Sequence, residues 1–506
     1  MTYRLSLFGT RSGSGKRVTR FGGAVASLVT LITAGCGGHS PASPGSGSGP
    51  VPGESTKVAI QVASTANDKF VHFNMTINQI TLTNQAGVTT TIFNTPTDLD
   101  FIPLNGSAAP FATVSIPQDV YTSAAISVSN PRFSFINMSS QGSIGINTDA
   151  YGYTPTPPVI TLASPITISG STMGLTLTLE AAQSGSYDTL SLPGQASFSI
   201  NPTFLLAAFQ IPQQPTSPQN GKCTGLAAQV NSIDSGGKAF TVTFAGDPLT
   251  NNAGTLQVAL SSSTTIQGIP SASSLAPGQL IDLDIALQPD TTYTASRVDV
   301  LDPTATDLNT GQLLELDPSY HNYVMTDAVQ QQGADLSSQP VGMGYPYEFG
   351  SATTFQVSGQ SVSLSNLPFQ AEFDGSTLAP GQMVSIGSTS ISVQGGTWTQ
   401  PTSITLVPQT IDGAVSAVAT SGSYTVYTVQ LAPYDLIAQM NSPSGAPVTY
   451  RLQNADQVFV YANSSTSKMN SSPPGVGGTF RFHGMLFNDG GVLRMAADQV
   501  SDGVPQ

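Results

Sequence analysis

Two pairs of carboxylates have a spacing that would let them act together. Asp282 and Asp284 are two residues apart, and so are Asp98 and Asp100. Because side chains at i and i+2 of an extended strand point to the same face, each pair would present two carboxylates side by side. Such a pair could bind calcium with nearby turn carbonyls, although the full twelve-residue calcium-loop pattern is absent. The alternative is a solvated acidic edge that opposes strand-to-strand aggregation.

Other signatures of chemistry are missing from the sequence. The histidines are His39, His72, His321 and His483, and no two have a metal-binding spacing of three or four residues. We expect His72 and His483 on the wet faces of strands. No Gly-x-Ser-x-Gly elbow and no phosphate-binding loop occurs. We therefore predict no catalytic residues, no metal site and no cofactor. A carbohydrate-active enzyme with carboxylates at module interfaces is the alternative to a non-enzyme.

An aromatic run is the candidate for binding. Tyr345, Tyr347 and Phe349 follow a glycine-rich stretch at the end of a long insertion. Exposed aromatic side chains on a loop would form a sugar-binding or protein-binding surface. Alternatively, the same side chains cap the core of their own module.

Cys36 is the residue with the best-defined chemistry. It follows five basic residues, a short apolar run from Phe21 to Ile32, and the small residues Ala34 and Gly35. A run of about 12 residues is too short to span a bilayer as a helix, which needs about 20, and this pattern is typical of a cleaved signal peptide.

The Ala34-Gly35-Cys36 sequence resembles a bacterial lipobox, which implies acylation of Cys36 and membrane attachment through the acyl chains. Gly37 is compatible with sorting to the outer membrane, so we expect a lipid-anchored cell-envelope protein facing the periplasm or the exterior. The alternative is ordinary cleavage that leaves a free N-terminal region.

Composition restricts the partners. Removing residues 1–35 removes five basic and no acidic residues, which changes the net charge from −14 to −19. This charge disfavours nucleic acid and anionic lipid headgroups. If Cys36 is acylated, Cys223 has no partner within the chain, because these are the two cysteines. We expect Cys223 to be a free thiol in a linker, or else to form an intermolecular bridge.

Residues 54–212 alternate with the period of two that is typical of strands, for example at Val58, Ile60 and Val62, and turn residues separate the runs. This pattern predicts an antiparallel β-sandwich. Residues 75–80 and 116–121 resemble a family of secreted bacterial lipoproteins, domain-of-unknown-function family 4382, and that resemblance implies a sandwich-like fold without catalytic residues.

The second half of the chain repeats itself. Leu275-Ala276-Pro277-Gly278-Gln279 recurs 103 residues later as residues 378–382, and residues 474–478 are a worn third copy. Pro followed by Gly favours a type II turn. Strand-like triplets precede these turns at residues 264–266, 353–355 and 458–460. The units resemble domain-of-unknown-function family 5666, which implies a small barrel related to the oligonucleotide/oligosaccharide-binding barrel.

The sequence thus predicts an all-β chain, an N-terminal antiparallel β-sandwich followed by three tandem small β-barrel-like modules. The predicted domains are a signal peptide (1–35), a lipidated cysteine and flexible tether (36–53), the sandwich (54–212), a linker (213–223), and modules at 224–303, 310–408 and 411–503. We expect a non-catalytic binding or structural role at the envelope, with a glycan or a protein as the candidate ligand.

Overall fold

The fold is that of a computed structural model, which describes residues 49–65, 70, 72–104, 106–138, 144–151, 158–188, 197–244, 255–317, 323–327, 330–333, 335–336, 344–358, 364–391, 398–431, 437–438, 456–468 and 473–502. The predicted signal peptide, Cys36 and most of the tether lie outside these residues, as do His39 and His321. Among the helices of the described ranges, none has the length and apolarity needed to cross a membrane.

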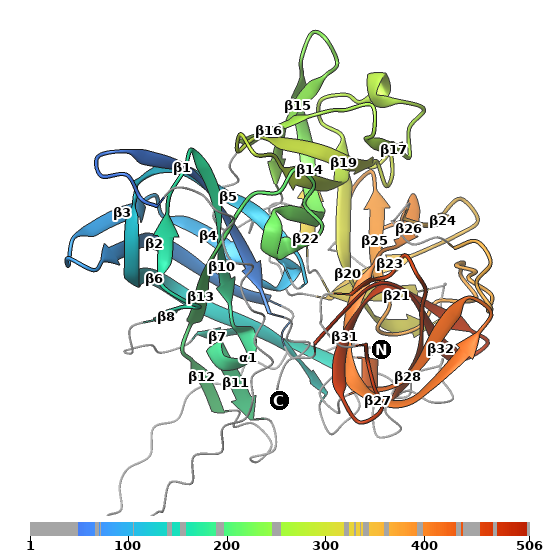
Figure 1. The fold of residues 1–506 in the computed structure, drawn as a ribbon. Helices are drawn as coiled ribbons and strands as arrows, with labels where there is room; N and C mark the ends of the chain where they lie inside the picture. The colour runs from blue at the N-terminus through green and yellow to red at the C-terminus, as the bar shows by residue number, and fades with distance from the viewer. Residues whose placement is uncertain are drawn as a thin grey trace, which may run out of the picture. The chain divides into compact units, whose positions relative to one another are not determined.

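The N-terminal part of the described chain forms two sheets (Figure 1). One sheet has the order β5-β1-β10-β13-β8, with β1 (Ser55–Ser64), β5 (Ala108–Pro117), β8 (Val159–Leu162), β10 (Thr172–Leu179) and β13 (Thr203–Phe209). The other has the order β3-β2-β6-β7, with β4 beside β2 and β9 beside β6. Its strands are β2 (His72–Asn84), β3 (Thr89–Phe93), β4 (Thr97–Asp100), β6 (Asp119–Met138), β7 (Ile144–Tyr151) and β9 (Ile166–Ile168). Short additions are η1 (Ile102–Leu104), α1 (Ala181–Ser184), β11 (Gly185–Asp188) and β12 (Ser197–Ile200).

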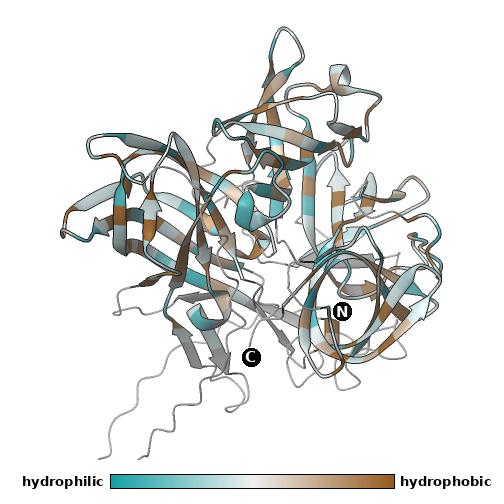
Figure 2. Ribbon diagram, in the orientation of Figure 1, coloured by the Kyte–Doolittle hydropathy of each residue, from teal (hydrophilic) through white to brown (hydrophobic). Residues whose placement is uncertain are grey.

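The two sheets enclose one hydrophobic core. Val58, Ile60 and Val62 of β1 are fully buried in the same cluster as Phe73 and Met75 of β2. Figure 2 shows hydrophobic and hydrophilic bands alternating along many strands. The all-β sandwich prediction is confirmed, with one difference: β1 pairs with β10 in parallel, and so does β13 with β8, so the first sheet is mixed.

The first module contains a closed barrel. Its elements are β14 (Lys222–Ile233), β15 (Ala239–Phe244), β16 (Thr255–Ala259), β17 (Thr265–Gln267), β18 (Leu280–Leu287) and β19 (Tyr293–Asp299), with η2 (Pro218–Asn220) before β14 and η3 (Ala272–Ser274) before β18. The strand order β16-β15-β14-β18-β19 closes through a parallel pairing of β16 with β19. The strands therefore form a small closed barrel, as the sequence predicts.

The third module closes in the same way, through the parallel pairing of β29 with β32. Its strands are β27 (Gln409–Ser421), β28 (Tyr424–Leu431), β29 (Gln457–Ala462), β30 (Ser467–Lys468), β31 (Thr479–Asp489) and β32 (Val492–Asp502). The second module has a sheet of β20 (Asp307–Asp317), β21 (Tyr323–Asp327), β22 (Gln330–Gly333), β23 (Gly344–Glu348), β24 (Thr354–Val357), β25 (Met383–Ser388) and β26 (Ser403–Leu406).

The turn that Pro-Gly forms in the first two modules recurs in the third module, where Val476 takes the place of the proline. Its glycine has a positive φ each time, 90° at Gly278, 90° at Gly381 and 88° at Gly477, which favours glycine because a Cβ is disfavoured there. Each glycine N–H donates a hydrogen bond to the carbonyl of one residue in the module's first strand. The N–H of that strand residue donates back to the carbonyl of the residue that follows the glycine. All six distances are 2.7–2.9 Å, and the strand residues are Val230, Leu313 and Val415. The worn third copy therefore keeps the backbone geometry without the leucine.

A second shared turn corrects the alignment of the triplets. The Oγ1 atoms of Thr264, Thr353 and Thr466 each accept a hydrogen bond from the backbone N–H three residues earlier and donate to a carbonyl of a neighbouring strand or loop. The third-module counterpart of residues 264–266 therefore begins at Thr466 and not at Val458. Val458 lies in β29, which corresponds to β16.

Candidate functional site

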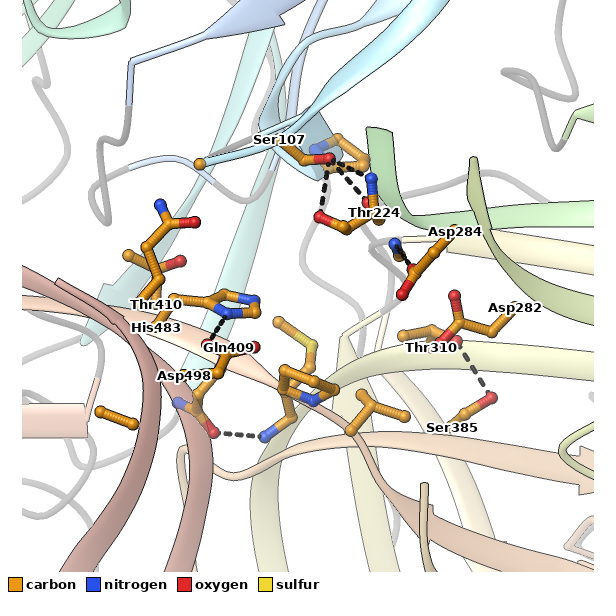
Figure 3. A pocket seen from close by; sticks show the side chains of 18 of the residues that line it. Ser107, Thr224, Asp282, Asp284, Thr310, Ser385, Gln409, Thr410, His483 and Asp498 are labelled. Carbon is orange, nitrogen blue, oxygen red and sulfur yellow. Dashed lines mark hydrogen bonds and ion pairs between the residues drawn. The ribbon is translucent and has the colours of Figure 1, made fainter. Parts of the chain in front are cut away.

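A cavity of about 320 Å³ opens among the described residues, and we refer to it as the central cavity (Figure 3). Its walls come from η1 and the residues after it in the sandwich, and from all three modules. The volume is at the lower end of the range of about 300–1,000 Å³ that is usual for ligand pockets.

Corresponding strands of the three modules supply part of the walls. In the first, second and third modules respectively, the fourth residue after the turn glycine is Asp282, Ser385 and Arg481. The sixth residue is Asp284, Gly387 and His483. Asp282, Asp284, Ser385 and His483 all line the cavity. Aligning the three turns in the sequence would have found these positions, but their convergence depends on the packing of the modules.

The wall from the first module is a buried ion cluster. Arg297 of β19 donates from Nη2 to Asp282 at 2.9 Å, and from Nε and Nη2 to Asp284 at 3.0 Å each. Its Nη1 also lies 3.4 Å from Asp299. The side chains of Arg297, Asp282 and Asp284 are 6%, 12% and 10% exposed. The aspartate pair is therefore neither a calcium site nor a solvated acidic edge, because both side chains are buried and their cation is a guanidinium.

Electrostatics in this wall follows from burial. Burial by itself would lower the pKa of Arg297. The carboxylates of Asp282 and Asp284 outweigh burial and raise the pKa above its ordinary value, so the guanidinium stays charged. Burial raises the pKa of Asp282, and Arg297 opposes that shift. Asp284 additionally accepts a hydrogen bond from the N–H of Gly225 at 2.9 Å.

The wall from the third module contains a histidine–aspartate pair. His483 Nδ1 lies 2.7 Å from Asp498 Oδ1, and the two side chains are 26% and 17% exposed (Figure 3). Burial lowers the pKa of His483, but Asp498 outweighs it, and the net shift is upward. Asp284 adds to the upward shift and Lys222 opposes it. His483 therefore does not lie on a wet strand face but faces the cavity.

The remaining walls are rich in hydroxyl and amide groups. In the second module, Thr310 Oγ1 and Ser385 Oγ are 3.0 Å apart on neighbouring strands. From the sandwich, Ser107 Oγ donates to the carbonyl of Thr224 at 2.6 Å, and the N–H of Thr224 donates back at 3.1 Å (Figure 3).

The second carboxylate pair positions the sandwich wall. Asp100 Oδ1 accepts hydrogen bonds from the N–H groups of Phe73 and Ile102 at 3.1 Å each, which fixes the start of η1. Its other oxygen pairs with His72. Asp98 accepts a hydrogen bond from Thr76. His72 is 1% exposed, so the expected wet face is wrong, and both aspartates bond to β2 instead of facing solvent as an acidic edge.

The predicted aromatic binding loop is a buried strand. Tyr345 and Tyr347 lie in β23 and are 3% and 1% exposed, and Phe349 packs edge-on against Phe355 at 5.4 Å between ring centroids. The Tyr347 hydroxyl accepts a hydrogen bond from Asn309 Nδ2 at 2.9 Å. These side chains form part of the second module's core, the alternative that the sequence left open, and they do not line the cavity.

Cys223 is not in a linker. It lies in β14, is fully buried, and its Sγ is 3.2 Å from Nε2 of Gln61 on β1. It shares a hydrophobic cluster with Ala59, Ala63 and Ala108 of the sandwich. Burial, and then the charge of Asp284, raise the pKa of its thiol. An intermolecular disulfide would require this core to open.

Within the described ranges, no three His, Cys, Asp or Glu side chains converge as metal ligands. The three carboxylates around Arg297 point to that cation.

Comparison with known proteins adds little on function. No curated protein matches the chain significantly. A solved structure of a glycoside hydrolase family 32 protein from Bifidobacterium adolescentis aligns with 88% of this chain and 67% of its own chain at 9% sequence identity. The TM-score of 0.11 is too low to indicate a shared fold. No match supports the resemblance of the sandwich to family 4382. Residues 228–299 match the family described as Domain of unknown function (DUF5666).

Proposed function

We propose that the protein is a lipid-anchored binding protein of the cell envelope, and that the central cavity holds its ligand. The observation that carries this proposal is the cavity itself, which is lined by polar side chains from the equivalent strands β18, β25 and β31 of the three modules and by those of the sandwich (Figure 3). Ligand sites commonly lie between domains and combine apolar walls with a few placed polar groups.

Binding agrees better with the carboxylate geometry than hydrolysis does. A glycosidase needs one carboxylic acid that gives up a proton and a second carboxylate that is free to act as base or nucleophile. Both oxygens of Asp284 are engaged by Arg297, and the same guanidinium binds Asp282. Protonating either group would cost an ion pair in a buried site.

We also propose that the second and third modules are divergent copies of the family matched by the first. The shared glycine turn and the shared threonine turn support this relationship, since both have the same hydrogen bonds in all three modules. The lipid anchor rests on the sequence around Cys36, and mass spectrometry of the N-terminal peptide from wild type and Cys36→Ser tests it.

The binding proposal is tested by thermal unfolding of the purified full chain with small polar molecules as probes. Gln330, which lines the cavity, is replaced with tryptophan to fill it. The matched control is Gln257→Trp on the exposed side of β16. A molecule that binds in the cavity should raise the unfolding temperature of the parent and the control and leave Gln330→Trp unchanged. Equal shifts in all three proteins would place binding elsewhere.

One observation favours a second function, a hydrolytic enzyme. Asp498 holds the imidazole of His483 in one orientation, as an acid does for a general base. Incubation with polysaccharides and ester substrates tests this function, with His483→Gln as the inactive variant. Turnover that persists in that variant would contradict it.

A further inference from the structure

The sequence Leu-Ala-Pro-Gly-Gln forms a turn twice in the chain, in two different surroundings. In the second module, the residues of this turn (378–382) are all buried, and Ala379 and Gln382 have no exposed surface. In the first module, Leu275 is buried, whereas residues 276–278 are exposed and Gln279 is half-buried. The same five residues are thus covered in the second module and open to solvent in the first.

The third module covers the second-module turn. Ala379 belongs to the hydrophobic cluster of the third module, together with Ile437. A Cβ on Gly381 would lie only 2.6 Å from Cγ1 of Ile437. The Nε2 atom of Gln382 donates a hydrogen bond to the carbonyl of Leu486 at 3.1 Å. We refer to the side chain of Ile437 and the carbonyl of Leu486 as the docking surface of the third module.

The glutamine amide has the same orientation in both turns. The N–H of Ala379 donates to Oε1 of Gln382 at 2.7 Å, and the N–H of Ala276 donates to Oε1 of Gln279 at 2.8 Å. Because a backbone N–H can only donate, these bonds fix which amide atom is the oxygen. The N–H₂ group is therefore left to bond elsewhere. That of Gln279 has no hydrogen-bond partner among the residues that the structure describes.

The turn geometry alone does not require the alanine and the glutamine. The third module has Gly475 and Gly478 at these two positions and still makes the shared backbone hydrogen bonds. In the second module, the alanine and the glutamine contact a neighbouring barrel. The first module presents the same residues on the same backbone, since φ is 90° at both Gly278 and Gly381.

We propose that the first-module turn, residues 275–279, is a docking site for another protein, whose barrel carries an open docking surface like that of the third module. An intact second copy of this chain does not offer that surface, because its own second-module turn fills it. The partner covers Ala276 and Pro277 with an apolar side chain and accepts the hydrogen bond of Gln279 on a main-chain carbonyl. The inference goes beyond the proposed function, since these residues do not line the central cavity.

Disulfide trapping between two full-length variants, both with Cys36→Ser, tests the inference. One variant carries Gly278→Cys, where a Cβ meets no atom within 4 Å. The other carries Ile437→Cys and Ala379→Asp, whose charge expels the second-module turn and opens the docking surface. A Cβ on Gly381 would lie 3.2 Å from Cβ of Ile437, near the separation of about 3.5–4.5 Å in disulfides. Equivalent docking of the first-module turn therefore brings the two cysteines together.

The cross-linked heterodimer should form about tenfold faster than with the control Ala86→Cys, on an exposed turn of the sandwich, because docking concentrates the two thiols. Gln279→Glu keeps an acceptor for the N–H of the turn and removes the N–H₂ donor, so it should abolish the excess when added to Gly278→Cys. Ile437→Cys with an intact Ala379 should give no excess, since its docking surface is filled. Non-reducing electrophoresis in a glutathione buffer measures the rates.

Cross-linking at the control rate would overturn the inference, and so would an excess that Gln279→Glu leaves unchanged. Cooperative thermal unfolding shows whether each variant folds. Gln382→Glu replaces Ala379→Asp if the aspartate prevents folding, because it removes the hydrogen bond to Leu486 and places a charge in the same contact. None of these variants alters a residue of the central cavity, so the proposed function is tested separately.

Discussion

Arg297 and Asp284 face each other across strands β19 and β18, and the guanidinium donates to both carboxylate oxygens at 3.0 Å. The same guanidinium reaches Asp282 and Asp299, so one buried cation holds three carboxylates at the edge of the central cavity.

Replacing Arg297 with methionine should destabilise the protein by about 3–5 kcal/mol at neutral pH, because it leaves buried carboxylates without a counterion. Urea unfolding measures the loss, and Lys238→Met on an exposed turn is the control. The loss relative to the parent should shrink as the pH falls toward the ordinary aspartate pKa of about 3.9, since protonation removes the buried charge. A loss that does not depend on pH would contradict the electrostatic explanation.

His483 should make stability depend on pH. Its folded pKa is raised, so its contribution is fully present below the unfolded pKa of about 6.5 and is lost as the pH rises through the folded value. The unfolding free energy should therefore fall across a window that starts near pH 6.5 and extends upward. Histidine NMR titration and urea unfolding at several pH values check this. Asp498→Asn should lower the pKa of His483, and an unchanged titration would refute the role of Asp498.

The three equivalent turns should differ in their tolerance of alanine. Each glycine has a positive φ, which costs a side chain about 1–2 kcal/mol. A Cβ at Gly278 or Gly477 would meet nothing within 4 Å, whereas at Gly381 it would lie 2.6 Å from Cγ1 of Ile437. Thermal unfolding should therefore rank Gly381→Ala as clearly the most destabilising of the three. Equal losses would mean that the chain near Ile437 moves aside easily.

Tyr347→Phe should lower stability by about 1–3 kcal/mol and leave ligand binding unchanged, because the hydroxyl bonds to buried Asn309 and lies away from the cavity. A double-mutant cycle with Asn309→Ala measures the coupling. Weaker ligand binding by Tyr347→Phe at unchanged stability would restore the sequence-based view of these aromatics as a binding surface.

Cys223 should be inert in the folded protein. Burial raises the pKa of its thiol and excludes reagents from it. In the Cys36→Ser variant it is the sole thiol, so a thiol reagent such as 5,5′-dithiobis(2-nitrobenzoate) should react only after denaturation. Rapid reaction under native conditions would indicate that the contact of β14 with the sandwich opens readily.

The sequence by itself determined the local features of this protein. Alternation of apolar and polar residues specified strands, because the two faces of a strand differ in burial. The Pro-Gly repeat specified a turn, because its φ requirement is local to a few residues. Even the worn third copy could be recognised, since the geometry of Gly477 needs only the glycine.

Tertiary structure alone decided what the side chains do. From the sequence, Asp282 and Asp284 were expected to form a solvated pair or a calcium site. In the structure, Arg297 from the next strand neutralises them. Tyr345 and Tyr347 were expected to be exposed, but strand pairing buries them. The cavity joins residues more than 350 positions apart, such as Ser107 and His483. Burial and charge pairing are properties of contacts between distant segments, and no local pattern of residues encodes them.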